Sequence, residues 1–207
     1  MPRIEAFEKY SEEYDEWFEK NVGFYEAELG AMRRLVPPPG AEGMEVGVGS
    51  GKFAAPLGIK IGLEPSEKMG RKAKRQGIEV YPGVAEDLPF SDDRFDFVLI
   101  VTTICFVDDV IKSFREVFRV LKDSGFIIVG FVDKESELGL QYAEKKESSK
   151  FYKDATFYST PEVLRDLKKA GFRTTNILQT LIPGEMPGTI LEGFGRGSFV
   201  VIKGMKK

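Results

Sequence analysis

Apolar residues alternate along the chain between runs typical of strands and spacings typical of helices. Two runs dominated by apolar residues, 95–101 and 126–132, are expected of strands covered on both faces of a sheet. Residues 110–121 repeat apolar positions every three or four residues, which predicts an amphipathic helix. Shorter apolar stretches predict five further strands: 44–47, 59–63, 78–81, 176–181 and 198–203. Strands that alternate with helices indicate an α/β fold with a doubly wound, mostly parallel seven-stranded sheet.

Residue types at the ends of the predicted helices support their boundaries. Residues 4–35 are predicted to be helical up to the three prolines at 37–39, which cannot continue a helix. Ser66 is a candidate N-cap for a helix to residue 75, and Ser159 for a helix that ends before Gly171.

Three segments interrupt this alternation. Residues 134–158 are polar and aromatic together, which indicates a partly helical insertion. A Gly/Pro-rich loop separates the last two predicted strands and is too long for a tight hairpin. The closing strand-loop-strand segment suggests an antiparallel strand at the sheet edge. After the glycines at 47–51 we expect only a short helix, because Pro56 and Gly58 would cut it.

Composition is that of a soluble, cytoplasmic globular protein. The 207 residues are 42% hydrophobic and 30% charged, which suits one domain. The net charge of −3 argues against general nucleic-acid binding, and no run is apolar enough to insert into a membrane or to resemble a signal peptide. The one cysteine, Cys105, cannot form an intrachain disulfide, which fits a reducing compartment.

The chain contains no histidine, and this limits its chemistry. It lacks the side chain that most often acts as a general base near neutral pH and the commonest transition-metal ligand, so we expect no metal site. Amide side chains are also scarce while lysine and glutamate are plentiful, which favours a thermophilic source. A thermal unfolding midpoint in the ordinary mesophile range would contradict that hypothesis.

The first predicted strand opens into a glycine-rich turn, and the second ends at an acidic residue. Gly47, Gly49 and Gly51 would let the backbone approach a ligand closely, as expected at the carboxyl ends of strands in an open α/β sheet. Glu64 is placed to accept hydrogen bonds from both hydroxyls of a ribose. The spacing Gly-x-Gly-x-Gly differs from the dinucleotide pattern, which would need a glycine at Lys52.

Short motifs follow one another over residues 44–132: Glu45-Val46-Gly47-Val48-Gly49-Ser50-Gly51, Leu63-Glu64-Pro65-Ser66-Glu67-Lys68-Met69, Ala85-Glu86-Asp87-Leu88-Pro89-Phe90, Phe95-Asp96-Phe97-Val98-Leu99 and Arg119-Val120-Leu121-Lys122. In this order and spacing they resemble the class I S-adenosyl-methionine-dependent methyltransferases, in particular their small ubiquinone/menaquinone-biosynthesis-like branch (methyltransferase type 11). The N-terminal Tyr14-Asp15-Glu16-Trp17-Phe18 is similar to that branch as well. The resemblance implies a Rossmann-like methyltransferase fold and S-adenosyl-methionine as the cofactor.

The resemblance also implies a role for each part of the chain. Residues 1–36 would form a helical cap, 43–132 the cofactor-binding core, 134–158 a cover over the acceptor site, and 159–207 a final helix and edge strands of the same domain. The implied cofactor-binding residues are Tyr14, Glu45, Gly47, Gly49, Gly51, Glu64, Pro65, Ala85, Glu86 and Thr102.

Within this set, the three glycines would admit the methionine end, and Glu45 would orient their loop. Glu64, with Pro65 beside it, would hold the ribose. Ala85 and Glu86 would border the adenine, and Tyr14 would close over the cofactor from the N-terminal helix. Thr102 and Thr103 would line the floor near the methyl group. That branch usually has an aspartate at the position of Val84, so adenine recognition would depend on backbone groups here.

Several of these residues also have purely structural interpretations. Threonine suits strands in general, so Thr102 and Thr103 fit a strand end without any ligand. Tyr14 and Trp17 could serve only to pack the N-terminal helix against the sheet. Cys105 reads as a small buried hydrophobe, since no histidine could activate it.

Methyl transfer from a sulfonium requires alignment of acceptor and methyl group more than it requires a base. Where the acceptor must lose a proton, Asp133 after the fifth strand or Tyr158 is the candidate base. We expect a small-molecule acceptor, and the aromatic residues of the insertion would suit one that is apolar, aromatic or cationic.

Two other classes of protein stay open from the residues alone. One is an oxidoreductase with a nucleotide cofactor such as NAD, which uses the same fold and a ribose-binding acid. The other is a module that binds S-adenosyl-methionine without transferring its methyl group. The sequence defines neither the acceptor nor the oligomeric state.

Overall fold

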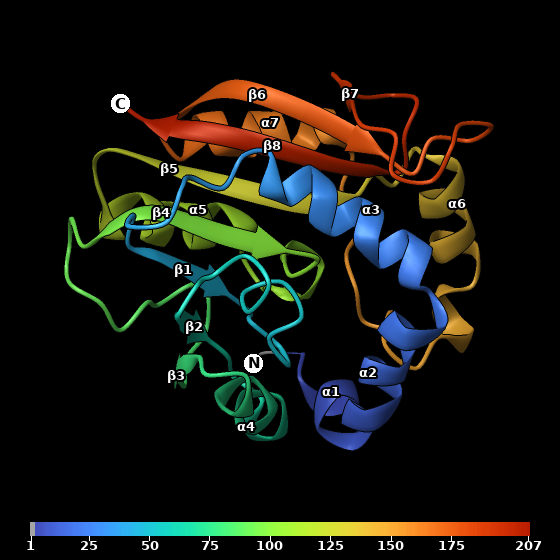
Figure 1. The fold of residues 1–207 in the computed structure, drawn as a ribbon, viewed down its shortest axis with the longest axis horizontal. Coiled ribbons are helices and arrows are strands. Elements are labelled where there is room, and N and C mark those ends of the chain that lie inside the picture. Colours follow the sequence, from blue (N-terminus) through green and yellow to red (C-terminus); the bar gives the residue numbers. More distant parts are fainter. Residues whose placement is uncertain (1–2) are drawn as a thin grey trace.

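Eight strands form one sheet in the computed structural model, which describes residues 3–207 (Figure 1). Their order across the sheet is β3-β2-β1-β4-β5-β8-β6-β7. The strands are β1 Gly43–Val46, β2 Ile61–Leu63, β3 Glu79–Tyr81, β4 Phe95–Val101, β5 Leu121–Val132, β6 Phe172–Thr180, β7 Leu191–Glu192 and β8 Phe199–Lys206. Strands β1 to β5 pair in parallel, whereas β8 is antiparallel to both β5 and β6, and β7 is antiparallel to β6.

The predicted α/β class and its methyltransferase-type sheet are confirmed, with one more strand than expected. The additional strand is the two-residue β7, which forms within the Gly/Pro-rich loop and is the antiparallel strand at the edge. The last strand, β8, lies inside the sheet between β5 and β6. Its row of buried residues, Phe199–Ile202, fits that central position.

The helices and short 3₁₀ turns lie on both faces of the sheet and beyond its ends (Figure 1). They are α1 Glu5–Lys9, α2 Ser11–Lys20, α3 Val22–Arg33, α4 Glu67–Arg75, η1 Ile104–Phe106, α5 Val110–Val120, α6 Glu137–Glu144, η2 Lys146–Ser148 and α7 Thr160–Lys169. Helix α3 crosses one face of the sheet, and α5 and α7 lie on the other. None of these helices within residues 3–207 is long and apolar enough to cross a membrane.

Two predicted helix starts are confirmed by their capping hydrogen bonds. The Ser66 hydroxyl accepts a hydrogen bond from the Met69 backbone N–H, 3.3 Å away, at the start of α4. At the start of α7, Ser159 and Glu162 form a capping box that satisfies two otherwise unpaired N–H groups. Gly171 follows α7 with a φ of 105°, as expected of a glycine just past a helix end.

The prediction of one helix over residues 4–35 is wrong, because the chain breaks at Tyr10 and Asn21. Both residues leave the helical region, and the Asn21 side-chain amide donates to the Trp17 carbonyl, which ends α2. The break lets α3 pack along the sheet while α1 and α2 turn aside, beyond the carboxyl ends of the strands and next to α4 (Figure 1).

The short helix expected after the glycine loop is also absent. Residues 51–58 form consecutive turns, in which the N–H groups of Ala55 and Leu57 donate to the carbonyls of Gly51 and Phe53. Pro56 has no N–H to extend this pattern, and Gly58 leaves it with a φ of 76°. The glycine loop is therefore followed by turns and not by a helix, so no helix N-terminus points toward the ligand side of this loop.

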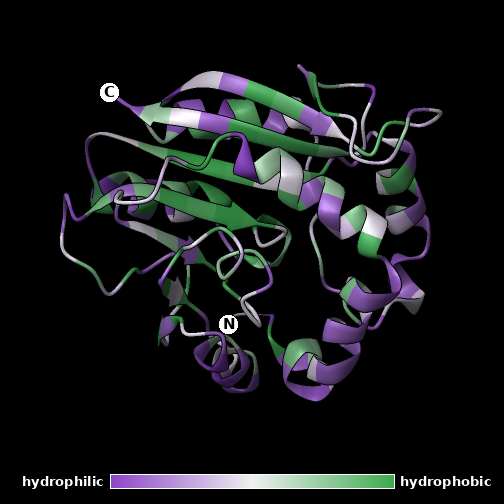
Figure 2. Cartoon of the chain, viewed as in Figure 1, coloured by the Kyte–Doolittle hydropathy of each residue, from purple (hydrophilic) through white to green (hydrophobic). Residues whose placement is uncertain are grey.

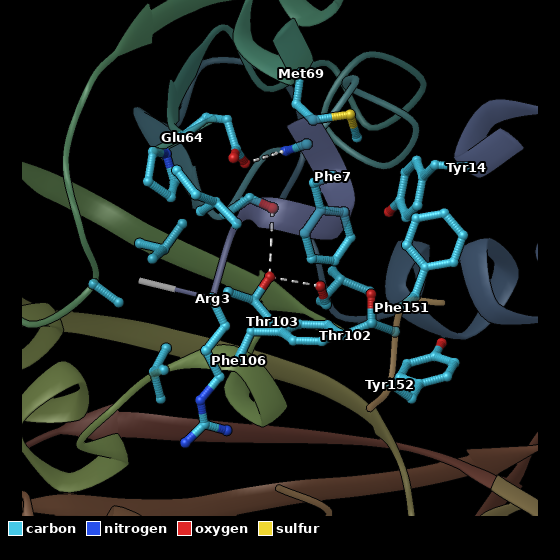
Figure 3. A pocket seen from close by; sticks show the side chains of 18 of the residues that line it. Arg3, Phe7, Tyr14, Glu64, Met69, Thr102, Thr103, Phe106, Phe151 and Tyr152 are labelled. Carbon is cyan, nitrogen blue, oxygen red and sulfur yellow. Dashed lines mark hydrogen bonds between the residues drawn. The ribbon is translucent and has the colours of Figure 1, made fainter. Parts of the chain in front are cut away.

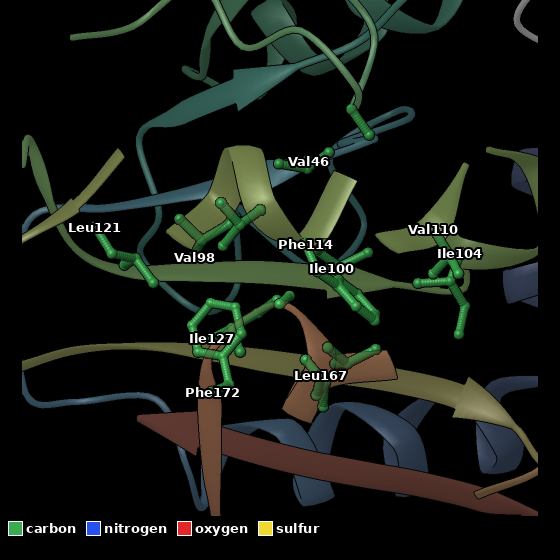
Figure 4. Close-up of a cluster of buried hydrophobic side chains, with 14 of the residues drawn as sticks. Val46, Val98, Ile100, Ile104, Val110, Phe114, Leu121, Ile127, Leu167 and Phe172 are labelled. Carbon is green, nitrogen blue, oxygen red and sulfur yellow. The ribbon is translucent and has the colours of Figure 1, made fainter. Parts of the chain in front are cut away.

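Alternating residues of β4 supply both hydrophobic cores. Val98 and Ile100 point into the core beneath α5 and α7, with Phe114, Leu167 and Ile127 around them (Figure 4). Their neighbours Phe97, Leu99 and Val101 belong to the opposite core, beneath α3.

In the ribbon coloured by hydropathy, the central strands β4 and β5 are mostly hydrophobic, whereas the helices α2 and α4 are mostly hydrophilic (Figure 2). Burial on both faces fixes the central strands and, with them, the loops at their carboxyl ends.

Candidate active site

A cavity of about 720 Å³ lies at the carboxyl ends of β1, β2 and β4. The loops after these strands form one side of it, and α1, α2, α3 and the 134–158 insertion form the other. In Figure 3, Glu64 lies on one side of the cavity and Tyr14, Phe151 and Tyr152 on the other. Its volume and position are those of a small-molecule site in an open α/β sheet.

The fold brings most of the predicted cofactor-binding residues to this cavity. The lining includes eight of the ten: Tyr14, Gly47, Gly49, Glu64, Pro65, Ala85, Glu86 and Thr102. Glu45 and Gly51 lie behind the lining.

Two glycines of the loop leave no room for a side chain. A Cβ atom on Gly47, whose φ is 71°, would lie 2.4 Å from a carbon of the Thr103 side chain. A Cβ atom on Gly51, whose φ is 88°, would lie 2.8 Å from Ile78. Gly47 therefore brings the backbone close to the cavity floor, while Gly51 lets the loop pack against the strand region behind it.

Glu64 is held rigidly at the edge of the cavity. Its Oε2 accepts a hydrogen bond from the Gly49 N–H and its Oε1 from the Ser66 N–H, each at 2.9 Å. Burial nevertheless raises the pKa of Glu64 to about 7, against the opposing effect of these two N–H groups. The carboxylate can accept further hydrogen bonds, since each oxygen has more than one acceptor site.

Glu45 is a second buried acid, one layer deeper than Glu64. It is 2% exposed, and its Oε2 has no hydrogen-bond partner among the described residues. Burial raises the pKa of Glu45 well above its usual value. It lies near the end of β1, two residues before Gly47 and behind the lining.

The predicted adenine side combines apolar and backbone groups. Val84 and Ala85 line the cavity there, and Glu86 uses one oxygen to accept the backbone N–H groups of Asp108 and Asp109, at 2.7 and 3.1 Å. Glu86 thus ties this side of the cavity to the start of α5. The side chain of Val84 can form no hydrogen bond, so this part of the lining offers a ligand only shape and backbone groups.

Thr102 and Thr103 form the floor between the two sides of the cavity (Figure 3). Thr102 has a φ of 49°, which is uncommon for a residue other than glycine and is found often at functional sites. The Thr103 hydroxyl donates to the Val101 carbonyl at 2.9 Å, and its methyl group occupies the space left by the missing side chain of Gly47.

Aromatic rings from distant segments pack together over the cavity. Phe7 lies 5.7 Å from Tyr14, 5.0 Å from Phe106 and 5.6 Å from Phe151, measured between ring centroids. Burial and the nearby carboxylates raise the pKa of Tyr14, so its hydroxyl stays protonated.

Polar contacts fasten α1 and α2 at three places. Arg3 donates to the Asp154 carbonyl and the Thr156 hydroxyl of the insertion. Glu8 accepts from the Ser66 hydroxyl at 2.7 Å, and Asp15 accepts from Ser50 at 2.6 Å and from Lys72 at 2.8 Å. The N-terminal helices therefore form a cover attached to both sides of the cavity.

The two residues predicted as bases do not line this cavity. The Asp133 carboxylate accepts hydrogen bonds from the Glu135 N–H, the Thr160 N–H and the Thr160 hydroxyl, so both oxygens join the segments before α6 and α7. Tyr158 lies in a separate recess of about 20 Å³ behind Thr102, Tyr142 and Tyr152. Val132, the last residue of β5, lines the cavity, whereas Asp133 directly after it does not.

Glu28 is the buried residue among the charged lining residues that sequence reasoning missed. It is 5% exposed and lies on α3 among the buried residues Ala27, Leu29 and Met32. An acidic residue within an apolar helix face was the available signal. Among residues 3–207, no group of three or more acidic, cysteine or histidine side chains is placed to hold a metal ion.

The fold and this site define an S-adenosyl-methionine-dependent methyltransferase. The family model described as a methyltransferase domain matches residues 44–129. The chain belongs to the class I S-adenosyl-methionine-dependent methyltransferases, in the ubiquinone/menaquinone-biosynthesis-like branch.

Known proteins similar to this chain include one structure and two sequences. A Thermotoga maritima structure, described as an S-adenosyl-methionine-dependent methyltransferase and possible histamine N-methyltransferase, is 47% identical with a TM-score of 0.94, covering 99% of this chain and 100% of that one. An uncharacterised Methanocaldococcus jannaschii protein is 44% identical over 98% of this chain and 100% of its own length.

A ubiquinone/menaquinone biosynthesis C-methyltransferase of Rickettsia bellii is 31% identical over 63% of this chain, which spans 56% of that protein.

Proposed function

We propose that the protein transfers the methyl group of S-adenosyl-methionine to a small-molecule acceptor bound in the same cavity. The observation that carries this proposal is the extent of the cavity. Its lining continues from Glu64 and the glycine loop, past Thr102, to Tyr142 and Tyr152 of the insertion. A cofactor held by the motif residues would leave the far end for a second, smaller molecule.

The residues at the motif end fit S-adenosyl-methionine. Glu64 would hold the ribose hydroxyls, the backbone of Gly47 and Gly49 would border the methionine portion, and Val84 and Ala85 the adenine. When bound, the cofactor would supply an activated methyl group on a positively charged sulfur. Both Glu64 and the neighbouring Glu45 are acids without a lysine or arginine partner among residues 3–207, which suits a cationic ligand.

Catalysis would consist mainly of alignment and exclusion of water. Thr102, fixed at an unusual backbone angle, would set the floor against which the acceptor lies. The ring cluster of Phe7, Tyr14, Phe106 and Phe151 would close the top. A rigid floor and an apolar cover hold two molecules in line without any proton transfer by the protein.

The insertion supports a small acceptor in preference to a macromolecular one. Tyr142, Phe151 and Tyr152 come from residues 134–158 and cover the far end of the cavity. Together with the attached N-terminal helices they enclose the reacting position. A protein or nucleic-acid chain could reach that position only if this cover opened.

The experiment that tests the proposal follows a radiolabelled methyl group. Purified protein is incubated with methyl-labelled S-adenosyl-methionine and with a cell extract separated by ultrafiltration into small-molecule and macromolecular fractions. We expect label in a product of the small-molecule fraction only. Label in the macromolecular fraction alone would overturn the small-acceptor proposal, and no transfer by a protein that binds S-adenosyl-homocysteine would indicate a binding module.

A further inference from the structure

Glu28 is a buried acid for which the described chain offers no partner. It is 5% exposed, it lines the cavity, and no hydrogen bond or ion pair joins it to any other residue between 3 and 207. Burial alone raises the pKa of Glu28 to about 8. Leaving such a group unpaired costs folding free energy, since a buried carboxylate is normally hydrogen-bonded or paired.

Three other buried acids have partners for their carboxylate oxygens. Asp133 accepts three hydrogen bonds, and Asp166, also buried, lies 3.1 Å from Arg165 and 3.6 Å from Lys169. Glu64 accepts two backbone N–H groups. Glu28 differs from these three acids because no described residue donates a hydrogen bond to it, although like Glu64 it lines the cavity.

The position of Glu28 assigns it to the acceptor end of the cavity. Helix α3, which carries Glu28, packs against β5, β6 and β8, on the side of the sheet from which the insertion starts. The charge of Glu28 also raises the pKa values of Tyr142 and Tyr152, the tyrosines of the insertion that line the cavity. The charge that acts on Glu45 is instead that of Glu64. Two acids therefore serve the cofactor end, and Glu28 stands apart from them.

Aromatic rings surround this end. Tyr142 and Tyr152 are stacked with ring centroids 5.0 Å apart, and Trp17, Phe18 and Phe151 also line the cavity. The face of an aromatic ring carries partial negative charge and attracts cations. A carboxylate among aromatic faces is a combination that binds a protonated or quaternary amine in preference to a neutral or acidic molecule.

We propose that Glu28 is the binding site for a cationic amine of the methyl acceptor, and that the acceptor is a small amine. This inference rests on the proposed function and adds the substrate class to it. A protonated nitrogen has no lone pair with which to attack a methyl group. Glu28 therefore anchors the acceptor through its cation and leaves a different, neutral atom of the acceptor facing the floor at Thr102.

Calorimetric titration of protein saturated with S-adenosyl-homocysteine tests this assignment. The probes are three matched pairs of amine and alcohol: 2-phenylethylamine and 2-phenylethanol, histamine and the corresponding imidazole alcohol, and butylamine and butanol. We expect at least one amine to bind at least about tenfold more tightly than its alcohol, the difference typical of a charged hydrogen bond. The Glu28→Gln variant, equal in shape and uncharged, should lose this preference.

The matched control is Glu26→Gln, which removes the same charge from an exposed position on the same helix. It should keep the preference for the amine. Both variants should bind S-adenosyl-homocysteine within about threefold of the parent protein, because Glu28 is not part of the cofactor end. A thermal melt of each variant confirms folding.

The outcomes separate the two proposals. If S-adenosyl-homocysteine does not bind the parent protein, the proposed function fails. If it binds and no amine is preferred over its alcohol, or if Glu28→Gln keeps the preference, the proposed function stands and the assignment of Glu28 is overturned. Loss of S-adenosyl-homocysteine binding in Glu28→Gln would place this acid at the cofactor's own amino group and would also overturn the assignment.

Discussion

The two ends of the cavity each present a buried acid, but the chain treats these acids differently. Glu64 lies within a frame of backbone N–H groups from Gly49 and Ser66, whereas Glu28 receives no hydrogen bond from residues 3–207. Burial raises the pKa of both carboxyls, to about 7 for Glu64 and about 8 for Glu28. Glu64 is therefore held in place by hydrogen bonds without a ligand, whereas Glu28 has no such hydrogen bonds and borders the cavity.

The two ends of the cavity also differ in whether backbone or side chains form them. The cofactor end consists of loops between adjacent parallel strands, and their backbone geometry requires glycine at fixed positions. The proposed acceptor end is assembled from side chains of α2 and α3 and from side chains of the insertion, which lies far from these two helices in the sequence. A backbone-built site can serve one cofactor in many proteins, while a side-chain-built site can change its specificity by substitution.

Substitution of Glu64 should have the largest of the predicted effects, on the binding of the cofactor product. In Glu64→Ala we expect the dissociation constant for S-adenosyl-homocysteine to rise about 100-fold, which corresponds to the loss of two charged hydrogen bonds to a ribose. Calorimetric titration measures the change. The control is Glu67→Ala, since Glu67 is an exposed acid three residues further along. An affinity within a few-fold of the parent would show that Glu64 does not hold the cofactor.

The Asp133→Asn substitution should affect stability and leave the chemical step intact. One end of an amide is a donor, so Asn would direct an N–H toward a donor of Glu135 or Thr160. We expect the free energy of unfolding to fall by about 2 kcal/mol, from one unsatisfied buried hydrogen bond. Denaturant titration measures this, with exposed Glu135→Gln as the control.

The rate of methyl transfer per folded molecule of Asp133→Asn should match that of the parent protein. A large fall in that rate, with stability unchanged, would restore Asp133 as a base and contradict the arrangement seen here.

Substitution of Glu28 should raise the stability of the folded protein, unlike substitution of Asp133, because a buried carboxylate without a partner costs folding free energy. The pKa of Glu28 is raised from 4.5 to about 8 by folding. The folded protein therefore holds a proton that the unfolded chain releases, and the contribution of Glu28 to stability declines as the pH rises through this interval. Glutamine does not titrate.

Without ligands, Glu28→Gln should therefore match the parent near about pH 5 and be more stable by roughly 1–2 kcal/mol near about pH 9. Thermal melts at several pH values measure the difference, and Glu26→Gln should show none. A parent protein that is the more stable of the two at high pH would mean that Glu28 has a partner within the fold, and the comparison of the two acids would fail.

The cofactor end could be predicted from the sequence better than the opposite end of the cavity. The strand pattern, the caps at Ser66 and Ser159, and the glycine loop with Glu64 depend on local rules, and the structure confirms each as a feature of the fold. The single N-terminal helix was wrong because its breaks are set by where α1 and α2 must pack. The helix after the glycine loop was wrong because Pro56 and Gly58 leave too few residues for one.

The acceptor end could not be predicted in the same way. Asp133 follows a strand like the cofactor residues do, yet its carboxylate points to Thr160, because the segment before α7 supplies donors there. Glu28 carries no motif and is revealed only by the apolar neighbours on its helix. Contacts between distant segments decide such positions, and no local pattern in one sequence records them.

The smallest predicted effect concerns the cover that the two ends share. Lys72 pairs with Asp15 at 2.8 Å and Glu12 at 2.9 Å and so fastens α2 to α4 beside the cofactor end. Its side chain is 15% exposed, and an ion pair of this kind contributes about 0.5–1 kcal/mol. In Lys72→Met we expect S-adenosyl-homocysteine to dissociate about two- to fivefold faster, measured by stopped flow.

The effect of Lys72→Met should stay small because the cover has other attachments. Glu8 still accepts from Ser66, and Phe7 still packs against Phe106 and Phe151. The control is Arg71→Met, which loses only its pair with Glu67 on the same helix and should leave the dissociation rate unchanged. If Lys72→Met instead weakened amine binding and spared S-adenosyl-homocysteine, the cover would act on the acceptor end alone, and the two ends would not share it.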